Sequence, residues 1–253
     1  MTANWFNLDG RVALVTGASK GLGKAIAAAL AQAGADLAIV SRTQADLDAA
    51  ASELRGFGHR VQTVRADVTR ESDVEAMTAS VVEHFGRVDI LVNNAGIGET
   101  TAVVDMDRER WDHVLAVNLS GPMLCCKHVG PHLLEQKSGK VINVASVMAT
   151  QVARYLSAYA ASKAALVQFT RTLALEWIRH GVQVNALCPG YFLTDMNDEF
   201  FTSERGQRFI ADLPIGRLGE QRELEGAAVF LASDASSYVT GATLYVDGGH
   251  SLA

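Results

Sequence analysis

The sequence predicts an α/β fold in which a parallel sheet is covered by helices on both faces. Short runs rich in β-branched residues alternate with longer Ala-rich segments of helical period along the whole chain, and this alternation is typical of parallel sheets with helical crossovers. The 253 residues are enough for one such sheet, because single α/β domains commonly reach this size. No low-complexity linker, repeat or charge block divides the chain, so we expect a single domain over residues 1–253.

Seven runs are expected to be strands. They are Arg11–Thr16, Asp36–Val40, Val61–Ala66, Val88–Asn93, Lys140–Ser146, Val182–Cys188 and Ala242–Val246. Helices are expected between them, over Gly21–Ala33, Thr43–Phe57, Arg70–Phe85, Asp107–Gln136, Ser157–His180 and Gln221–Ala232. The segment at about 191–213 breaks this rhythm, since it has helix-like sequence where a short connection would be enough. We expect it to be an inserted substrate lid.

The composition excludes several classes of function. Hydrophobic residues make up 49% and charged residues 20% of the chain, as in soluble globular proteins. The net charge of -6 argues against a nucleic-acid partner. The N-terminus has no secretory pattern, and no apolar run is long enough to span a membrane. Three cysteines are too few for a disulfide framework, and neither they nor the seven histidines have metal-ligand spacing. We therefore expect a cytoplasmic protein that binds no metal, membrane or nucleic acid.

A glycine-rich segment, TGASKGLG, follows the first expected strand and opens a helix. Glycines let the backbone turn tightly and approach a pyrophosphate, which then meets free N–H groups at the helix N-terminus. A close-packed turn without a ligand is the alternative, but a position between a strand and a helix is the context that a dinucleotide site requires. The residues expected to bind the cofactor here are Gly17, Ser19, Lys20, Gly21, Leu22 and Gly23.

The end of the second expected strand indicates which dinucleotide is bound. Sites selective for NAD place Asp or Glu there to hold the ribose 2′-hydroxyl, but this chain has Ser41 and Arg42 and no acid. Arg42 and Lys20 can each make charge-assisted hydrogen bonds to a 2′-phosphate, and Ser41 a neutral one. The sequence therefore predicts NADP(H), unless both cations are only solvated surface residues.

Motifs along the whole chain resemble those of the classical short-chain dehydrogenase/reductase family. They are TGASKGLG, Asp67-Val68, NNAG at 93–96, Asn118, Ser146, YAASK at 159–163, PGYFLT at 189–194 and VDGG at 246–249. All occur in the family's order, with Ser146 thirteen residues before Tyr159. The resemblance implies a Rossmann-type sheet, reversible hydride transfer between a nicotinamide and an alcohol or carbonyl carbon, and a homotetramer.

The resemblance also implies roles for individual residues. Asp67 and Val68 would contact the adenine, and Asn94, Ala95 and Gly96 would line the adenosine ribose. Pro189, Gly190, Phe192 and Thr194 would hold the nicotinamide carboxamide. Asn118, Ser146, Tyr159 and Lys163 match the family's catalytic tetrad, in which Tyr159 and Lys163 also contact the cofactor.

The tetrad has the chemistry that such a reaction needs. Tyr159 would be the acid in carbonyl reduction and the base in alcohol oxidation, although a free phenol has a pKa of about 10. A lysine ammonium one helical turn away, at ~5 Å, would lower that pKa by roughly two units. Ser146 would hydrogen-bond the substrate oxygen. Asn118 stands in a helical pattern where Asn has poor propensity, so we expect a local distortion of the helix there. In the family such an Asn anchors a water that links the Lys to solvent.

The sequence says least about the substrate. Candidate substrate-binding residues are Ser146, Met148, Tyr155, Tyr159 and Tyr191. The phrase PGYFLTDMN is similar to the sugar-acid branch of the family, such as gluconate 5-dehydrogenases, whereas PIGRLGE and VDGG also occur in 3-oxoacyl-carrier-protein reductases. We expect a keto-sugar acid or polyol first, a hydrophobic cyclic or aryl ketone second and a 3-oxoacyl thioester third. A non-catalytic NADP-binding sensor or scaffold is the alternative of another class.

Overall fold

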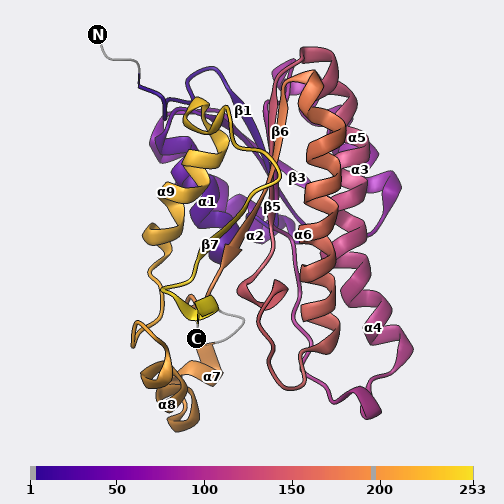
Figure 1. Cartoon of the computed structure of the whole chain (residues 1–253). Helices are drawn as coiled ribbons and strands as arrows, with labels where there is room; N and C mark the ends of the chain where they lie inside the picture. Colours follow the sequence, from indigo (N-terminus) through magenta and orange to yellow (C-terminus); the bar gives the residue numbers. More distant parts are fainter. Residues whose placement is uncertain (1–3, 195–197, 253) are drawn as a thin grey trace.

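Seven parallel strands form one sheet in the part of the chain that the computed structural model describes, residues 4–194 and 198–252 (Figure 1). Their order across the sheet is β3-β2-β1-β4-β5-β6-β7. The strands are β1 (Val12–Thr16), β2 (Asp36–Ser41), β3 (Val61–Arg65), β4 (Ile90–Asn93), β5 (Gly139–Val144), β6 (Val182–Pro189) and β7 (Thr243–Val246). Each expected strand is present within two residues of its predicted bounds, and the predicted doubly wound parallel fold is confirmed.

The helices follow the expected pattern with one informative difference. They are α1 (Gly21–Gln32), α2 (Gln44–Leu54), α3 (Glu71–Phe85), α4 (Arg108–Leu115), α5 (Gly121–Gln136), α6 (Ser157–Trp177), α7 (Asp198–Thr202), α8 (Glu204–Asp212) and α9 (Gln221–Ala232). The single long helix expected over Asp107–Gln136 is α4 and α5 joined by a π-helical turn at Ala116–Ser120. Asn118 lies in this turn, where a distortion was expected.

The sheet separates two apolar layers because alternate side chains of a strand point to opposite faces. In β1, Ala13 and Val15 pack with α1, α2 and α9, whereas Val12 and Leu14 pack with α3, α5 and α6. Figure 1 shows α1 and α9 on one side of the sheet and α3, α5 and α6 on the other. Both faces of the central strands are therefore buried, which explains their nearly continuous apolar sequences.

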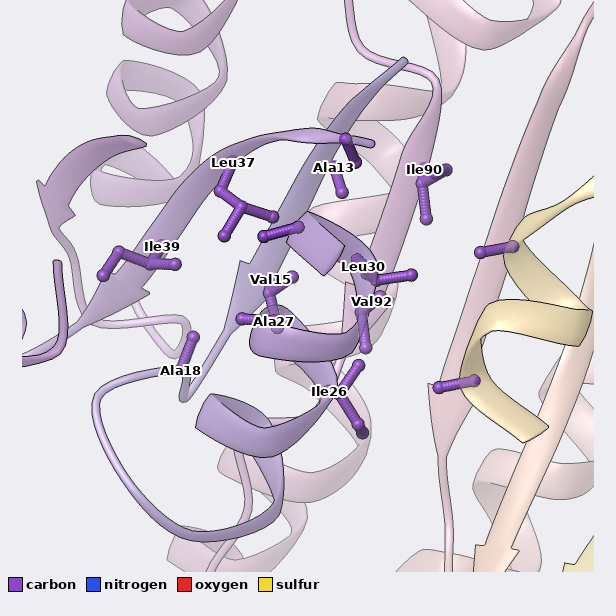
Figure 2. Close-up of a cluster of buried hydrophobic side chains, with 14 of the residues drawn as sticks. Ala13, Val15, Ala18, Ile26, Ala27, Leu30, Leu37, Ile39, Ile90 and Val92 are labelled. Atoms are coloured by element: carbon purple, nitrogen blue, oxygen red, sulfur yellow. The ribbon is translucent and has the colours of Figure 1, made fainter. Parts of the chain in front are cut away.

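The first layer shows how closely α1 lies on the sheet. Ile26, Ala27 and Leu30 of α1 are fully buried and project among the side chains of β1, β2 and β4 (Figure 2). The alanines of this helix leave little space between its backbone and the strands. The N-terminus of α1 is consequently held close to the carboxyl end of β1, where a phosphate site was predicted.

The carboxyl ends of the strands carry the loops that form the site. The strand order reverses between β1 and β4, and ligands of open α/β sheets bind in the crevice outside the strand ends at such a point. Figure 1 shows α7, α8 and the C-terminal turn at this same end, where β6 stops. The expected lid at about 191–213 includes α7 and α8, while its residues 195–197 lie outside the described part. Its closure over a substrate stays a prediction.

No helix within residues 4–194 and 198–252 is long and apolar enough to cross a membrane.

Candidate active site

A groove of about 410 Å³ runs along the carboxyl ends of the strands, from the end of β2 to the start of α6. Every residue that was expected to bind the cofactor lines it: Gly17, Ser19, Lys20, Gly21, Leu22, Gly23, Ser41, Arg42, Asp67, Val68, Asn94, Ala95, Gly96, Tyr159, Lys163, Pro189, Gly190, Phe192 and Thr194. Ser146 lines the same groove. The fold thus brings these segments together, and their roles as ligands of a cofactor stay a prediction.

The glycine loop fits a dinucleotide because its backbone is exposed to the groove and closely packed behind it. A Cβ on Gly17 would lie 2.9 Å from the Cα of Ala95, and Gly17 has a φ of +65°. On the groove side of the loop, a Cβ on Gly21 would meet nothing nearer than Thr194, at 3.8 Å. The side-chain amide of Asn94 donates to the carbonyls of Thr16 and Gly17, at 3.0 and 3.1 Å. The free N–H groups at the start of α1 therefore face an open, rigid cradle.

Polar and basic groups surround the far end of the groove, where an adenosine would lie. Lys20 and Arg42 are both exposed there. Burial raises the pKa of Asp67, but hydrogen bonds from the backbone and hydroxyl of Thr69 and the charges of Arg42 and Arg70 outweigh it, so the pKa is lowered. Asp67 is thus an acceptor-only carboxylate near neutral pH. The charged donors Lys20 and Arg42 suit a ribose that carries a phosphate.

Three members of the expected tetrad meet where β5 ends and α6 begins. The hydroxyl of Ser146 hydrogen-bonds the phenol of Tyr159 and accepts from the backbone N–H of Met148, at 3.1 Å. Lys163 lies one turn after Tyr159 on α6, with its Nζ 5.7 Å from the centre of the tyrosine ring. That Nζ donates to the carbonyl of Val144, at 2.9 Å. The strand end and the helix therefore hold the hydroxyl, the phenol and the ammonium in one place.

The fourth member, Asn118, joins the site from the π-helical turn. It is fully buried. Its Oδ1 accepts from the backbone N–H of Ile97, and its Nδ2 donates to the carbonyl of Ile97, both at 2.9 Å, and to the hydroxyl of Ser162, at 3.0 Å. A Cβ on Gly96 would lie 3.4 Å from both the Asn118 Oδ1 and the Lys163 Nζ. The turn thus aims this amide at the loop after β4, where Asn118 and Lys163 both approach Gly96.

The pKa of Tyr159 is raised, contrary to the expectation that Lys163 lowers it. Burial is the largest cause, and the hydrogen bond with Ser146 acts in the opposite direction. Burial also lowers the pKa of Lys163 to about 8, against an opposing effect of Cys188. The expectation was wrong because it counted the attraction between the two charges and omitted the cost of removing both from water.

Comparison with known proteins agrees with these motifs and this geometry. A family model described as enoyl-(acyl carrier protein) reductase, within the short-chain dehydrogenases/reductases, matches residues 17–251. A D-threitol dehydrogenase of Mycolicibacterium smegmatis is 40% identical over 98% of this chain and 95% of its own length. A galactitol 2-dehydrogenase (L-tagatose-forming) of Cereibacter sphaeroides is 44% identical over 98% of this chain and 97% of its own.

A solved gluconate 5-dehydrogenase of Burkholderia cenocepacia, in complex with NADP and tartrate, superposes with a TM-score of 0.95. It is 36% identical and covers 99% of this chain and 98% of that one. The chain belongs to the short-chain dehydrogenase/reductase family. The resemblance inferred from the motifs is thereby confirmed, and the protein is an oxidoreductase of this family.

Within this short-chain dehydrogenase/reductase, the expected substrate residues do not all share the groove. Met148 is only 4% exposed, Tyr155 is 54% exposed, and neither lines the groove. Tyr191 lies outside it too, but the charge of Tyr159 contributes, after burial, to raising the pKa of Tyr191, so the two phenols are near one another. Tyr191 is thus the expected substrate residue best placed beside the tetrad, and the roles of all three stay predictions.

Sequence reasoning missed the C-terminal turn that supports Tyr191. The ring of His250 meets the Tyr191 ring edge to face, with the ring centres 5.2 Å apart, and Tyr191 also makes ring contacts with Phe201 and Phe209. The amide of Gln151 donates to the carbonyl of Ser251, at 2.9 Å, which joins this turn to the loop after Ser146. The spacing of the histidines bears only on metal binding, and no local pattern in the sequence reports a ring contact between residues so far apart.

The aromatic residues of the inserted segment pack against one another. Phe200, Phe201 and Phe209 form mutual ring contacts, and Phe201 is 3% exposed. Phe201 and Phe209 therefore form the packed side of α7 and α8, whereas Phe200, at their edge, is 39% exposed. Among residues 4–194 and 198–252, no group of three or more His, Cys, Asp or Glu side chains could hold a metal ion.

Proposed function

We propose that this protein is an NADP(H)-dependent oxidoreductase that interconverts a secondary alcohol and a ketone of a polyol or sugar acid. The observation that carries the proposal is the hydrogen-bonded Ser146–Tyr159 pair beside Lys163, at the end of a groove whose other end presents Arg42. A hydroxyl, a phenol and an ammonium at one end suit proton transfer to a carbonyl oxygen. Cations at the other end suit a 2′-phosphate.

In the reductive direction, Tyr159 donates its phenolic proton to the substrate oxygen while Ser146 hydrogen-bonds that oxygen. A nicotinamide held in the groove would supply the hydride to the carbonyl carbon in this direction and would accept it from the alcohol in the reverse direction. The raised pKa of Tyr159 keeps its proton on the phenol at neutral pH, which suits an acid. Lys163, held by the Val144 carbonyl, stabilises the phenolate that forms. Asn118 fixes the Ile97 loop against α6. In the same proposal, Asn118 anchors a water that links Lys163 to solvent.

The substrate class rests on similarity and on the character of the site. The relatives named above act on threitol, galactitol and gluconate according to their names. Two of the groups beside Tyr159, Ser146 and Tyr191, bear hydroxyls and so suit a substrate with several hydroxyls.

A hydrophobic ketone is the second candidate, because Val152, in the loop between Ser146 and α6, is 90% exposed. A 3-oxoacyl thioester belongs with this candidate, since the matching family model is named for an acyl-carrier-protein reductase.

The test is a turnover assay with matched tyrosine variants. Purified protein is assayed with D-threitol, galactitol and gluconate in the presence of NADP⁺ or NAD⁺, and with aryl ketones and a 3-oxoacyl thioester in the presence of NADPH. We expect oxidation of at least one polyol or sugar acid with NADP⁺, and a loss of roughly a thousandfold or more in kcat for Tyr159→Phe, which lacks the transferred proton. Tyr238→Phe is the control, since Tyr238 is fully exposed and outside the groove.

Three outcomes would contradict parts of the proposal. Near-native turnover by Tyr159→Phe would remove the mechanism. Turnover of the aryl ketone or thioester alone would replace the substrate class. Tight NADPH binding with no turnover of any compound would favour the non-catalytic sensor or scaffold.

A further inference from the structure

A chain of buried hydrogen bonds joins β4 and β5 to α6. Asn93 of β4 and Asn143 of β5 are register partners, and the side-chain amide of Asn93 donates to the Oδ1 of Asn143, at 2.9 Å. The Nδ2 of Asn143 in turn donates to the hydroxyl of Thr170, at 2.8 Å. Thr170 donates to the carbonyl of Leu166, one turn earlier on α6, at 2.8 Å. The two amides and the hydroxyl are at most 2% exposed, so they form a polar path through an apolar layer.

Direction, rather than stability, is what this polar path adds to the layer. Leu173 and Ala174 of α6 belong to the apolar cluster that covers this face of the sheet. Apolar contact is non-directional, so it holds a helix on a sheet without fixing how far the helix lies along a strand. A buried hydrogen bond adds little net free energy because it replaces bonds to water, but it depends strongly on distance and angle. The polar path therefore fixes the place of α6 on β5.

The same two elements carry the tetrad residues. Asn143 directly precedes Val144, whose carbonyl accepts from the Nζ of Lys163, at 2.9 Å. Thr170 lies seven residues after Lys163, which is about two helical turns, so both side chains leave α6 on the same side. Helix α6 is thus bound to two successive residues of β5, through Thr170 and through Lys163. Because a helix is stiff, a shift of α6 at Thr170 is carried to Lys163 and, one turn further, to Tyr159.

We propose that Thr170 and Asn143 are positioning residues: their hydrogen bond sets where α6 lies along β5, and so where the tetrad residues of α6 meet Ser146. This proposal rests on the proposed function, in which those residues transfer the proton. Neither Thr170 nor Asn143 lines the groove, so neither touches substrate or cofactor in this role. Their effect on the reaction runs through the backbone of α6.

Thr170→Val tests the bond because threonine and valine have nearly the same shape. The methyl group that replaces the hydroxyl cannot lie 2.8 Å from the Asn143 Nδ2, since a carbon needs about 3.5–4.0 Å, so we expect α6 to shift relative to β5 by roughly half an ångström or more. The value of kcat for oxidation should fall by about ten- to a hundredfold, the scale of a misplaced catalytic group. Thr170→Ser keeps the hydroxyl and should retain at least about half of the wild-type kcat.

The measurement is steady-state oxidation of D-threitol, galactitol and gluconate with NADP⁺. The KM for NADP⁺ should change by less than about threefold in Thr170→Val, because Arg42 and the glycine loop stand on other elements. A fall in kcat without a matching rise in this KM distinguishes positioning of the tetrad from a general loosening of the groove. Thr170→Ala removes the hydroxyl without a clash and serves if Thr170→Val does not fold.

Helix α3 offers matched controls. Thr78 is also a buried helical threonine, 3% exposed, and its hydroxyl also donates one turn back, to the Val74 carbonyl at 2.9 Å. Within the described part of the chain no side chain donates to Thr78, so Thr78→Val should leave kcat within about twofold of wild type. Met77→Ala controls for stability, because it leaves a cavity in the core and should lower Tm by a few degrees without changing kcat.

A crystal structure of Thr170→Val gives a readout that does not need turnover. Helix α6 should be displaced relative to β5 at Lys163, and an undisplaced α6 overturns the proposal. An unchanged kcat in Thr170→Val also overturns it, as does an equal loss in Met77→Ala, because the loss would then follow stability. A loss that Thr170→Ser does not recover has the same consequence. If the wild type oxidises none of the three compounds, the proposed function fails, whereas the structure of Thr170→Val still decides the role of Thr170.

Discussion

Tyr159 and Lys163 are both held toward their neutral forms by burial. The pKa of the phenol is raised and that of the ammonium is lowered to about 8. Each charge loses hydration there, but a pKa of about 8 still leaves Lys163 mostly protonated at neutral pH, whereas Tyr159 keeps its proton and is neutral. The pair is therefore arranged so that a charge forms on Tyr159 only when the substrate oxygen takes its proton.

These shifts predict opposite pH profiles for the two directions of reaction. Oxidation needs unprotonated Tyr159, and because its pKa is raised, kcat/KM for oxidation should rise with pH across roughly pH 6 to 10. Reduction needs the protonated phenol and should stay level through neutral pH, falling only in the alkaline range. Steady-state rates in both directions at saturating cofactor would measure this. A flat oxidation profile would show that Tyr159 does not gate the proton.

We predict that the choice of cofactor depends on Arg42. It lines the groove, and no acidic residue stands beside it at the end of β2. Arg42→Ala should therefore raise the KM for NADPH by about ten- to a hundredfold, because a charge-assisted hydrogen bond is lost. The KM for NADH should change little. Lys24→Ala is the control, because Lys24 on α1 pairs with Glu53 and does not line the groove. An NADPH preference that survives in Arg42→Ala would assign the selectivity elsewhere.

At the scale of elements, the turn between α4 and α5 shows how one residue is positioned by a change of helix type. The π-helical turn at Ala116–Ser120 lets the Asn118 amide bond both backbone groups of Ile97 and reach Ser162 on α6. A continuous α-helix over Asp107–Gln136 would rotate this side chain relative to that loop. The poor helix propensity of Asn indicated a distortion at Asn118, but the direction in which the Asn118 amide points depends on the loop after β4.

Strand β5 carries a buried lysine at the end remote from the active site. Lys140 is 8% exposed and its Nζ donates to the hydroxyl of Ser236, at 3.2 Å. Burial lowers its pKa from 10.5 to about 8; Asp234 opposes this effect and Arg11 adds to it. A lysine with a depressed pKa destabilises the fold below the folded-state pKa, and this cost disappears as pH rises from about 8 to 10.5.

Lys140→Met should therefore stabilise the protein at neutral pH. We expect a gain of about 1–2 kcal/mol in the free energy of unfolding at pH 7, after allowance for the lost hydrogen bond and for solvent screening. The difference from wild type should shrink above about pH 9, where Lys140 is neutral in the folded protein. Urea unfolding at both pH values measures it. A variant less stable than wild type at pH 7 would show that the Ser236 and Asp234 contacts outweigh the cost of burial.

At the scale of the whole molecule, large apolar side chains remain on the outer faces of the long helices. Leu175 on α6 is 79% exposed, and Met123 on α5 is 40% exposed. Strand β7 also lies at the edge of the sheet. Exposed apolar surface and an unpaired strand edge are features that association covers.

We predict that the protein is a homotetramer in solution, as the family resemblance implied. Light scattering should give a mass about four times that of one chain, and Leu175→Glu should lower it, because the variant would place charges in an apolar contact. Glu176→Asp, at the adjacent position, is the conservative control. A monomer in the wild type would refute the prediction.

The sequence alone predicted the fold class, which is confirmed, the residues that line the groove, and a catalytic tetrad whose roles stay a prediction. Strand and helix periods, the glycine loop and the spacing from Ser146 to Tyr159 are patterns within short segments, and their order along the chain sets which strand ends meet. Residues such as Arg42 and Gly96 could therefore be named before their positions were known.

Only the tertiary structure decided how the site is enclosed and which charges it favours. The ring contact of His250 with Tyr191, and the hydrogen bond from Thr101 to the carbonyl of Tyr155, join segments far apart in the sequence. The pKa shifts of Tyr159 and Lys163 follow from burial by many elements at once. Burial and long-range contacts are properties of the packed chain, so no spacing of residues in the sequence reports them.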